Sequence, residues 1–194
     1  MKHRNRNFVR KICRLAGVCL LVAATVVLIA WQWNVHRSAQ RAENYVRTLR
    51  ALIPEPQGAA PEERRENAMS VLAVDGIDFV GILELPRCAA ALPVGADWGE
   101  SSNYPCRFHG SVYDRTVQIG TTTQKGQFDF YREISVGDPV YFTDMEGNRY
   151  TYQVKDLRYE KHADQAALRR EDAALTIFIK NEFAFEYIMV FCDV

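Results

Sequence analysis

Residues 128–154, FDFYREISVGDPVYFTDMEGNRYTYQV, decide how this chain folds. Two runs rich in Val, Tyr, Phe and Thr, 138–144 and 149–156, have the composition of β-strands, and the second ends two residues beyond this stretch. The residues between them read Met-Glu-Gly-Asn (145–148), and Gly beside Asn between two such runs is typical of a tight hairpin turn. Gly137 adds a second turn signal before the first run. The stretch therefore predicts a β-hairpin.

Further short strands are expected on both sides of this hairpin. They are predicted at residues 79–85, 112–120, 175–180 and 185–192. Little helix is expected between them, with a turn or two over 127–134 and a further short helix over 162–171. Many short strands at close spacing predict that residues 71–194 form a closed or nearly closed domain, mostly β.

The order of these segments resembles that of a sortase, a membrane-anchored cysteine transpeptidase of Gram-positive surfaces. Five segments carry the resemblance in one order: FVGILELPRCAAALPV (79–94), YPCRFHGSVYDRTVQIG (104–120), the 128–154 stretch, ALTIFIK (174–180) and YIMVFC (187–192). Another small β-barrel with the same turns is the alternative. The resemblance implies a sortase-like eight-stranded β-barrel.

The same resemblance implies that the family's chemistry is missing. A sortase uses a Cys thiolate as nucleophile, a His as general acid and an Arg that stabilises the oxyanion or the substrate. Lys180 stands at the position of the Cys, and Tyr187 stands at the position of the Arg. Thr122, between Thr121 and Thr123, stands at the position of the His. No catalytic residue is therefore expected at these three positions.

A shift in the alignment would not restore the missing residues. No His lies between His109 and His162, and no Cys lies between Cys106 and Cys192. No Arg follows Arg170. Therefore no small shift of the alignment brings a Cys, a His or an Arg to its expected position.

Three functions remain open on this reading. The first is a sortase-like domain without turnover that binds a sorting-signal peptide, a surface protein or an active sortase. The second is a divergent sortase or cysteine transpeptidase that uses Cys192, Cys106 or Lys180 instead. Cys192 matches a terminal-strand Cys of the family that is not the nucleophile, so we expect Cys192 and Cys106 to be buried thiols. Cys106 and His109 would point to opposite faces of an extended segment.

The third function is a structural surface scaffold whose groove has closed. An open groove lined by Thr122, Lys180 and Tyr187 would favour binding. A groove filled by Phe183, Phe185 or Tyr187 would favour the scaffold instead.

Neither a cofactor nor a metal ion is expected. The three cysteines outside the apolar N-terminal segment form no Cys-x-x-Cys pair, and the four His are scattered.

The N-terminal segment has the pattern of a membrane anchor. Residues 15–31 carry no charge, and residues 1–14 carry six basic side chains and no acid. This asymmetry predicts a cytoplasmic tail at 1–14, a transmembrane signal-anchor at 15–33 and an extracellular remainder. A cleaved signal peptide is the alternative, although no convincing small-x-small cleavage site follows the span.

Residues 34–70 are expected to connect the span to the barrel. Apolar residues recur at spacings of three and four up to Ile53, which predicts a helical stalk, and Pro54 begins a linker that runs to residue 70. Of 24 basic and 24 acidic residues in the chain, 18 basic and 24 acidic ones remain in 34–194. This acidic balance argues against nucleic acid as a partner. The expected partners are the membrane and a peptide or protein in the groove.

Overall fold

The computed structural model describes residues 2–55, 69–99, 104–123, 129–161, 173–181 and 186–194. The chain divides into two compact units, Met1–Arg37 and Ser38–Val194. The helix that was expected over 162–171 lies outside the described residues.

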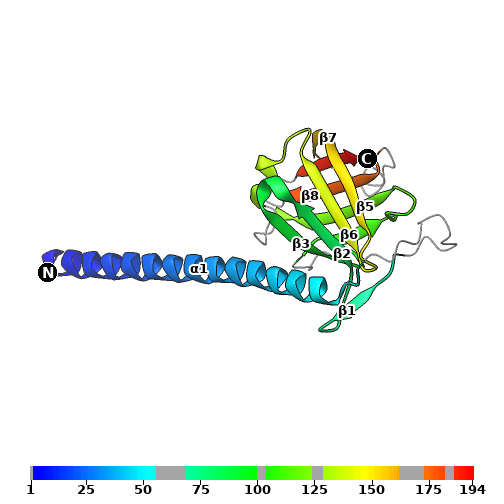
Figure 1. Cartoon of the computed structure of the whole chain (residues 1–194). Coiled ribbons are helices and arrows are strands. Elements are labelled where there is room, and N and C mark those ends of the chain that lie inside the picture. Colours follow the sequence, from blue (N-terminus) through cyan, green and yellow to red (C-terminus); the bar gives the residue numbers. More distant parts are fainter. Residues whose placement is uncertain (1, 56–68, 100–103, 124–128, 162–172, 182–185) are drawn as a thin grey trace. The chain divides into compact units, whose positions relative to one another are not determined.

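Helix α1 runs over Lys2–Leu52 (Figure 1). In the first unit, residues 14–33 are exposed throughout, and their large apolar side chains contact no other part of the unit closely enough to be buried. Among the described residues, this is the one helix that is long and apolar enough to cross a membrane. The segment is therefore compatible with the expected anchor.

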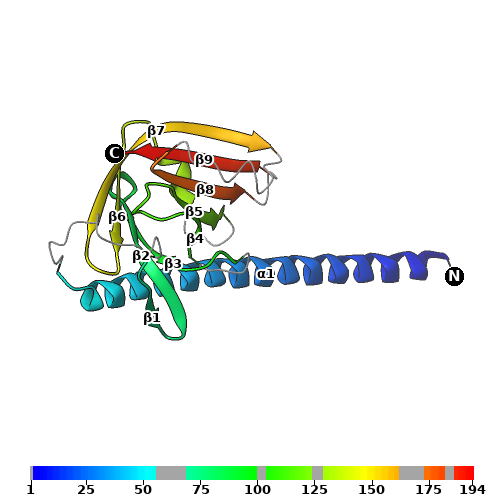
Figure 2. The ribbon, with the colours of Figure 1, turned by 90° about the vertical axis from the view of Figure 1, so that its right-hand side faces the viewer.

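The second unit is built on nine strands. They are β1 (Leu72–Val74), β2 (Ile77–Leu85), β3 (Ala90–Gly95), β4 (Cys106–His109), β5 (Val117–Thr122), β6 (Pro139–Asp144), β7 (Arg149–Lys161), β8 (Leu175–Asn181) and β9 (Glu186–Asp193). Eight of them follow the order β2-β3-β4-β5-β8-β9-β7-β6, and β6 pairs back with β2. This closes the eight-stranded barrel that was expected, and β1 pairs with β2 outside it (Figures 1 and 2).

The expected hairpin is confirmed. Strands β6 and β7 pair antiparallel, and the turn between them is built around the buried carboxylate of Asp144. This carboxylate accepts hydrogen bonds from the backbone N–H groups of Glu146 and Asn148, at 3.0 and 2.8 Å. Gly147 has a φ of 87°, a conformation that favours glycine.

The strand that was expected over 112–120 begins only at Val117. Asp114 explains the difference, because its Oδ1 accepts hydrogen bonds from the backbone N–H groups of Ser111 and Thr116. The hydroxyl of Thr116 donates to the same oxygen at 2.5 Å. A side chain that accepts hydrogen bonds from nearby backbone N–H groups in this way favours a turn over a strand.

Two short 3₁₀ helices complete the unit. One, η2, covers Pro86–Cys88, and the other, η4, covers Asp129–Glu133. The second agrees with the helical turn expected over 127–134.

The C-terminal part of α1, from Ser38 to Leu52, belongs to the second unit. Its apolar stripe packs on the barrel, where Val46 and Leu49 contact a cluster that includes Phe79, Ile82 and Met145. Leu49 is fully buried. The segment expected as a stalk therefore ends as a helix that covers one side of the barrel.

The main core fills the interior of the barrel. Along β8, Leu175, Ile177 and Ile179 point into this core and are fully buried. The intervening residue Phe178 belongs to a separate apolar cluster on the other face of the strand. This alternation, with a period of two residues, defines an inner and an outer face for β8 and its neighbours.

Candidate functional site

The three residues that the sequence resemblance aligns with the catalytic positions of a sortase lie side by side in the structure. Thr122 is the last residue of β5, and it pairs with Lys180 on the parallel strand β8. Lys180 in turn pairs with Tyr187 on the antiparallel strand β9. Directly paired residues place their side chains on the same face of a sheet. We call Thr122, Lys180 and Tyr187 the polar row (strands labelled in Figure 2).

The polar row lies on the outer face, away from the barrel core. The paired residues Ile119, Ile177 and Val190, in neighbouring positions along the same strands, belong to the inner core. Thr122 is 8% exposed, whereas Lys180 and Tyr187 are half-buried. The row is thus partly shielded from solvent.

An aromatic cluster covers the outer face beside the polar row. It consists of Trp98, Phe108, Phe178 and Tyr187, which pack together with the buried Met189 and Phe191. The ring centroid of Phe178 lies 5.3 Å from that of Trp98, 5.0 Å from that of Phe108 and 6.5 Å from that of Tyr187. Tyr187 belongs both to the row and to the cluster, so the two features are continuous.

Gly120 permits the closest contact in this cluster. A Cβ atom at this position would lie 2.4 Å from the Phe178 ring and 2.5 Å from the Trp98 ring. Any side chain larger than hydrogen would therefore displace one of the rings. Sequence reasoning singled out neither Trp98 nor Gly120 as part of the site. The one available signal was an isolated glycine inside a strand pattern, which indicates close approach of another group.

The chemistry that the polar row offers is donation of hydrogen bonds and a positive charge. A Lys ammonium has three N–H donors, and the Thr and Tyr hydroxyls can each donate one more. None of the three is a thiol, an imidazole or a guanidinium. The row is suited to holding an electron-rich group, and it carries none of the three groups that a cysteine transpeptidase uses.

Cys192 lies far from the polar row. It points into the core of the barrel, is fully buried, and pairs with Leu175 at the opposite end of β8 from Lys180. Burial raises the pKa of the Cys192 thiol to about 12. The predicted burial of this thiol is confirmed.

Cys106 is also buried, as expected. Its Sγ donates to the backbone oxygen of Tyr104 at 3.5 Å. His109 is exposed, and the pairing of β4 with β5 shifts register between Arg107 and His109. The buried thiol and the exposed imidazole therefore do not form a pair.

Cys88, on η2, is half-buried. Burial raises its pKa, and the carboxylates of Glu133 and Asp138 raise it further. A raised pKa leaves less of the reactive thiolate at neutral pH.

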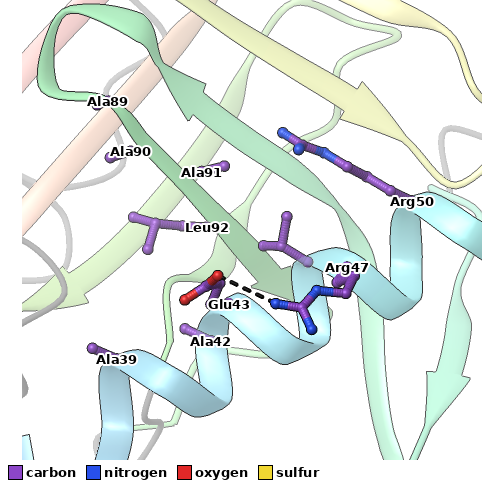
Figure 3. A pocket seen from close by; sticks show the side chains of 10 residues that line it. Ala39, Ala42, Glu43, Arg47, Arg50, Ala89, Ala90, Ala91 and Leu92 are labelled. Atoms are coloured by element: carbon purple, nitrogen blue, oxygen red, sulfur yellow. Dashed lines mark hydrogen bonds and ion pairs between the residues drawn. The ribbon is translucent and has the colours of Figure 1, made fainter. Parts of the chain in front are cut away.

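A groove of about 500 Å³ lies elsewhere in the second unit, between α1 and β3 (Figure 3). Ala42 and Val46 line it from the helix, and residues 89–92 line it from the barrel. On the helix side of the groove, Glu43 and Arg47 form an ion pair, with 3.3 Å between a carboxylate oxygen and a guanidinium nitrogen. The residues of the polar row do not contribute to it. Phe183 and Phe185, which were expected to show whether the sortase-type groove is filled, lie outside the described residues.

No group of three or more His, Cys, Asp or Glu side chains in the described part of the chain could hold a metal ion.

Comparison with known proteins gives similarity at the level of structure. No family model matches the chain, and no curated protein matches it. A sortase D5 transpeptidase from Clostridium perfringens is similar with a TM-score of 0.53 and 13% identity, over 80% of this chain and 96% of that one. Sortase C-3 from Streptococcus pneumoniae is similar with a TM-score of 0.52 and 16% identity, over 84% of this chain and 83% of that one. Sortase C1 from Streptococcus agalactiae is similar with a TM-score of 0.50 and 15% identity, over 82% of this chain and 88% of that one. The chain has the sortase fold.

Proposed function

We propose that this protein is a membrane-anchored, outward-facing sortase-like domain that binds a peptide without catalysing transpeptidation. The observation that carries the proposal is the polar row. Three paired residues, at the positions where the resemblance places a sortase's catalytic side chains, are a Thr, a Lys and a Tyr. The expected ligand is a sorting-signal peptide, either free or as part of a surface protein.

Loss of all three groups argues against turnover. An ammonium has no lone pair with which to attack a carbonyl carbon. A Thr hydroxyl cannot protonate a leaving amine near pH 7, because its pKa is far too high. When members of a catalytic unit are lost, the remaining acceleration comes from binding and positioning alone.

The outer face retains features that suit a ligand. Lys180 and Tyr187 are partly accessible polar groups, and they stand on paired central strands of a closed barrel. A rigid strand holds such donors more precisely than a loop does. Trp98 and Phe108, both half-buried, offer apolar surface beside them.

A divergent cysteine transpeptidase has less support. Cys192 points into the core, and Cys106 is buried with its thiol donating to the backbone oxygen of Tyr104. The structural scaffold is the second candidate. It is favoured by one observation, the ring of Trp98 packed over Gly120 and Phe178, which occupies part of the outer face.

The test uses the full chain in detergent micelles, because the C-terminal part of α1 packs on the barrel. The protein is incubated with fluorescent sorting-signal peptides and a glycine-based amine acceptor. We expect peptide binding without cleavage or ligation above background. Thiol-dependent ligation would refute the non-catalytic assignment, and absence of binding would favour the scaffold.

A matched variant asks whether the groove still has the family's geometry. It combines Lys180→Cys, Thr122→His and Tyr187→Arg. Any gain of ligation would show that the row is still placed for sortase chemistry. Continued inactivity of a folded triple variant would show that the row no longer has the geometry of a sortase's catalytic groups.

The membrane orientation is tested separately. Protease added to intact cells should remove residues 38–194 and leave the N-terminal tail protected. Protection of the barrel until the cells are lysed would contradict the outward orientation.

A further inference from the structure

We propose that the polar row recognises the free α-carboxylate of a peptide that ends in an apolar residue. The inference rests on the proposed function, that this face binds peptides, and it names the ligand class. The site would therefore bind the C-terminal carboxylate of a peptide instead of an intact peptide bond within a chain.

The first argument is the charge at the centre of the row. Lys180 is the middle member of three paired residues, with Thr122 on the neighbouring strand on one side and Tyr187 on the neighbouring strand on the other. A neutral amide carbonyl can accept a hydrogen bond from the ammonium, but it carries no net charge to complement it. A carboxylate gains a charge-assisted hydrogen bond, which is shorter and about twice as strong as a neutral one.

The second argument is the geometry of the pairing. Directly opposed residues on neighbouring strands have Cβ atoms about 4.5–5.5 Å apart. The side chains of Lys180 and Tyr187 extend from such a pair on the same face, so the ammonium and the phenol can both reach one carboxylate. Thr122 stands on the other side of Lys180 with its backbone fixed in β5. A carboxylate has two oxygens with about four acceptor sites, which matches several converging donors.

The third argument is the apolar surface directly beside the charge. The next row along the same face consists of Gly120, Phe178 and Met189. Trp98 packs on it, with its ring centroid 5.3 Å from that of Phe178. An apolar side chain on the last residue of a bound peptide would rest against Trp98 and Tyr187 while its carboxylate meets Lys180. Exclusion of water by such a side chain strengthens the charge interaction.

The experiment compares two pools of random pentapeptides with apolar last residues. The pools are identical except that one ends in a carboxylate and the other in an amide. Binding to the full chain in detergent micelles at pH 7 is followed by anisotropy of labelled peptides. In a Trp31→Phe, Trp33→Phe background, emission from Trp98, the remaining tryptophan of the chain, reports whether the ligand reaches the aromatic cluster.

We expect the acid pool to bind at least about tenfold more tightly than the amide pool, as one charge-assisted hydrogen bond implies. Lys180→Gln should remove this preference, and Lys180→Arg should retain part of it. Lys155→Gln, which removes an exposed lysine on β7, is the matched charge control and should leave the preference unchanged.

The outcomes separate the inference from the function on which it rests. Equal binding of both pools would overturn carboxylate recognition and leave peptide binding intact. A preference for the acid pool that survives Lys180→Gln would also overturn the inference, because the carboxylate would then be recognised elsewhere. Binding of neither pool, with the variants folded by circular dichroism, would overturn peptide binding itself.

Discussion

Strand β8 has two faces, and they differ in what they retain of a sortase. On the inner face, Ile177 and Ile179 are fully buried and pack in the barrel core. On the outer face, Lys180 stands between Thr122 and Tyr187, where the resemblance to sortases places the catalytic groups. The residues that form the barrel and those that would perform chemistry alternate along one strand. Substitutions on the outer face can therefore leave the core of the barrel unchanged.

The difference between the two faces predicts that the unfolding free energy depends mainly on residues of the inner face. The largest effect is expected from Phe142→Ala, because Phe142 is fully buried in the main core and its ring packs against Gly81. Truncating a buried Phe costs about 3–5 kcal/mol of unfolding free energy. Urea denaturation in the Trp31→Phe, Trp33→Phe background, followed by Trp98 emission, measures the loss.

Leu52→Ala is the control for this prediction. Leu52 is 55% exposed at the end of α1, so its truncation should cost less than about 0.5 kcal/mol. Similar losses for the two variants would contradict a core inside the barrel.

The outer face should also be sensitive where it is tightly packed. Gly120→Ala places a methyl group within 2.5 Å of two aromatic rings, so we expect a loss of about 1–3 kcal/mol. Adding Trp98→Ala should recover part of that loss, because one of the rings is then gone. A double-mutant cycle of urea midpoints measures the coupling. Strictly additive losses would mean that Trp98 does not pack over Gly120.

The Cys192 thiol on the inner face makes the stability of the protein depend on pH. Its pKa is raised from 9.0 to about 12 by burial, so the folded state disfavours the thiolate. The unfolded chain releases this proton more readily, and stability is therefore complete below pH 9 and decreases as the pH rises towards 12. We expect a loss of about 1.4 kcal/mol per pH unit within this window.

Cys192→Ala isolates this effect. The variant should be less stable than the parent at pH 8, and the difference should shrink between pH 9 and 12. A difference that stays constant over this range would contradict a buried thiol at this position. Fast labelling of Cys192 by a thiol reagent in the folded protein at neutral pH would contradict it as well.

The barrel was accessible to sequence reasoning where local chemistry determines it. The turn at Gly147 and the alternation along β8 each follow from a few adjacent residues. The start of β5 was predicted too early, because Asp114 forms hydrogen bonds that compete with the strand. The available signal was local as well, since Gly110, Ser111 and Asp114 are residue types that favour turns.

The candidate site was likewise predictable only in part. The polar row was predictable because Lys180 and Tyr187 lie in segments that resemble a family in order and spacing, and pairing then brings them together. The aromatic cluster was not predictable. Trp98 and Phe178 are far apart in the chain, and their contact depends on how a connection folds over the outer face. Long-range packing of this kind leaves no periodic signal in the sequence.

The smallest effect on stability is expected at the polar row itself. Lys180 is half-buried on the outer face near the end of β8, so Lys180→Ala removes no core contact and should change the unfolding free energy by less than about 1 kcal/mol. Its effect on ligand binding should be much larger, because the central donor of the row is lost. The informative measurement pairs the urea midpoint with peptide affinity for Lys180→Ala and Phe142→Ala. If the two faces have separate roles, Lys180→Ala lowers affinity at nearly unchanged stability, and Phe142→Ala lowers stability with little change in the affinity of the protein that remains folded. A Lys180→Ala variant that loses several kcal/mol would show that the lysine supports the barrel, and the division between the two faces of β8 would then fail.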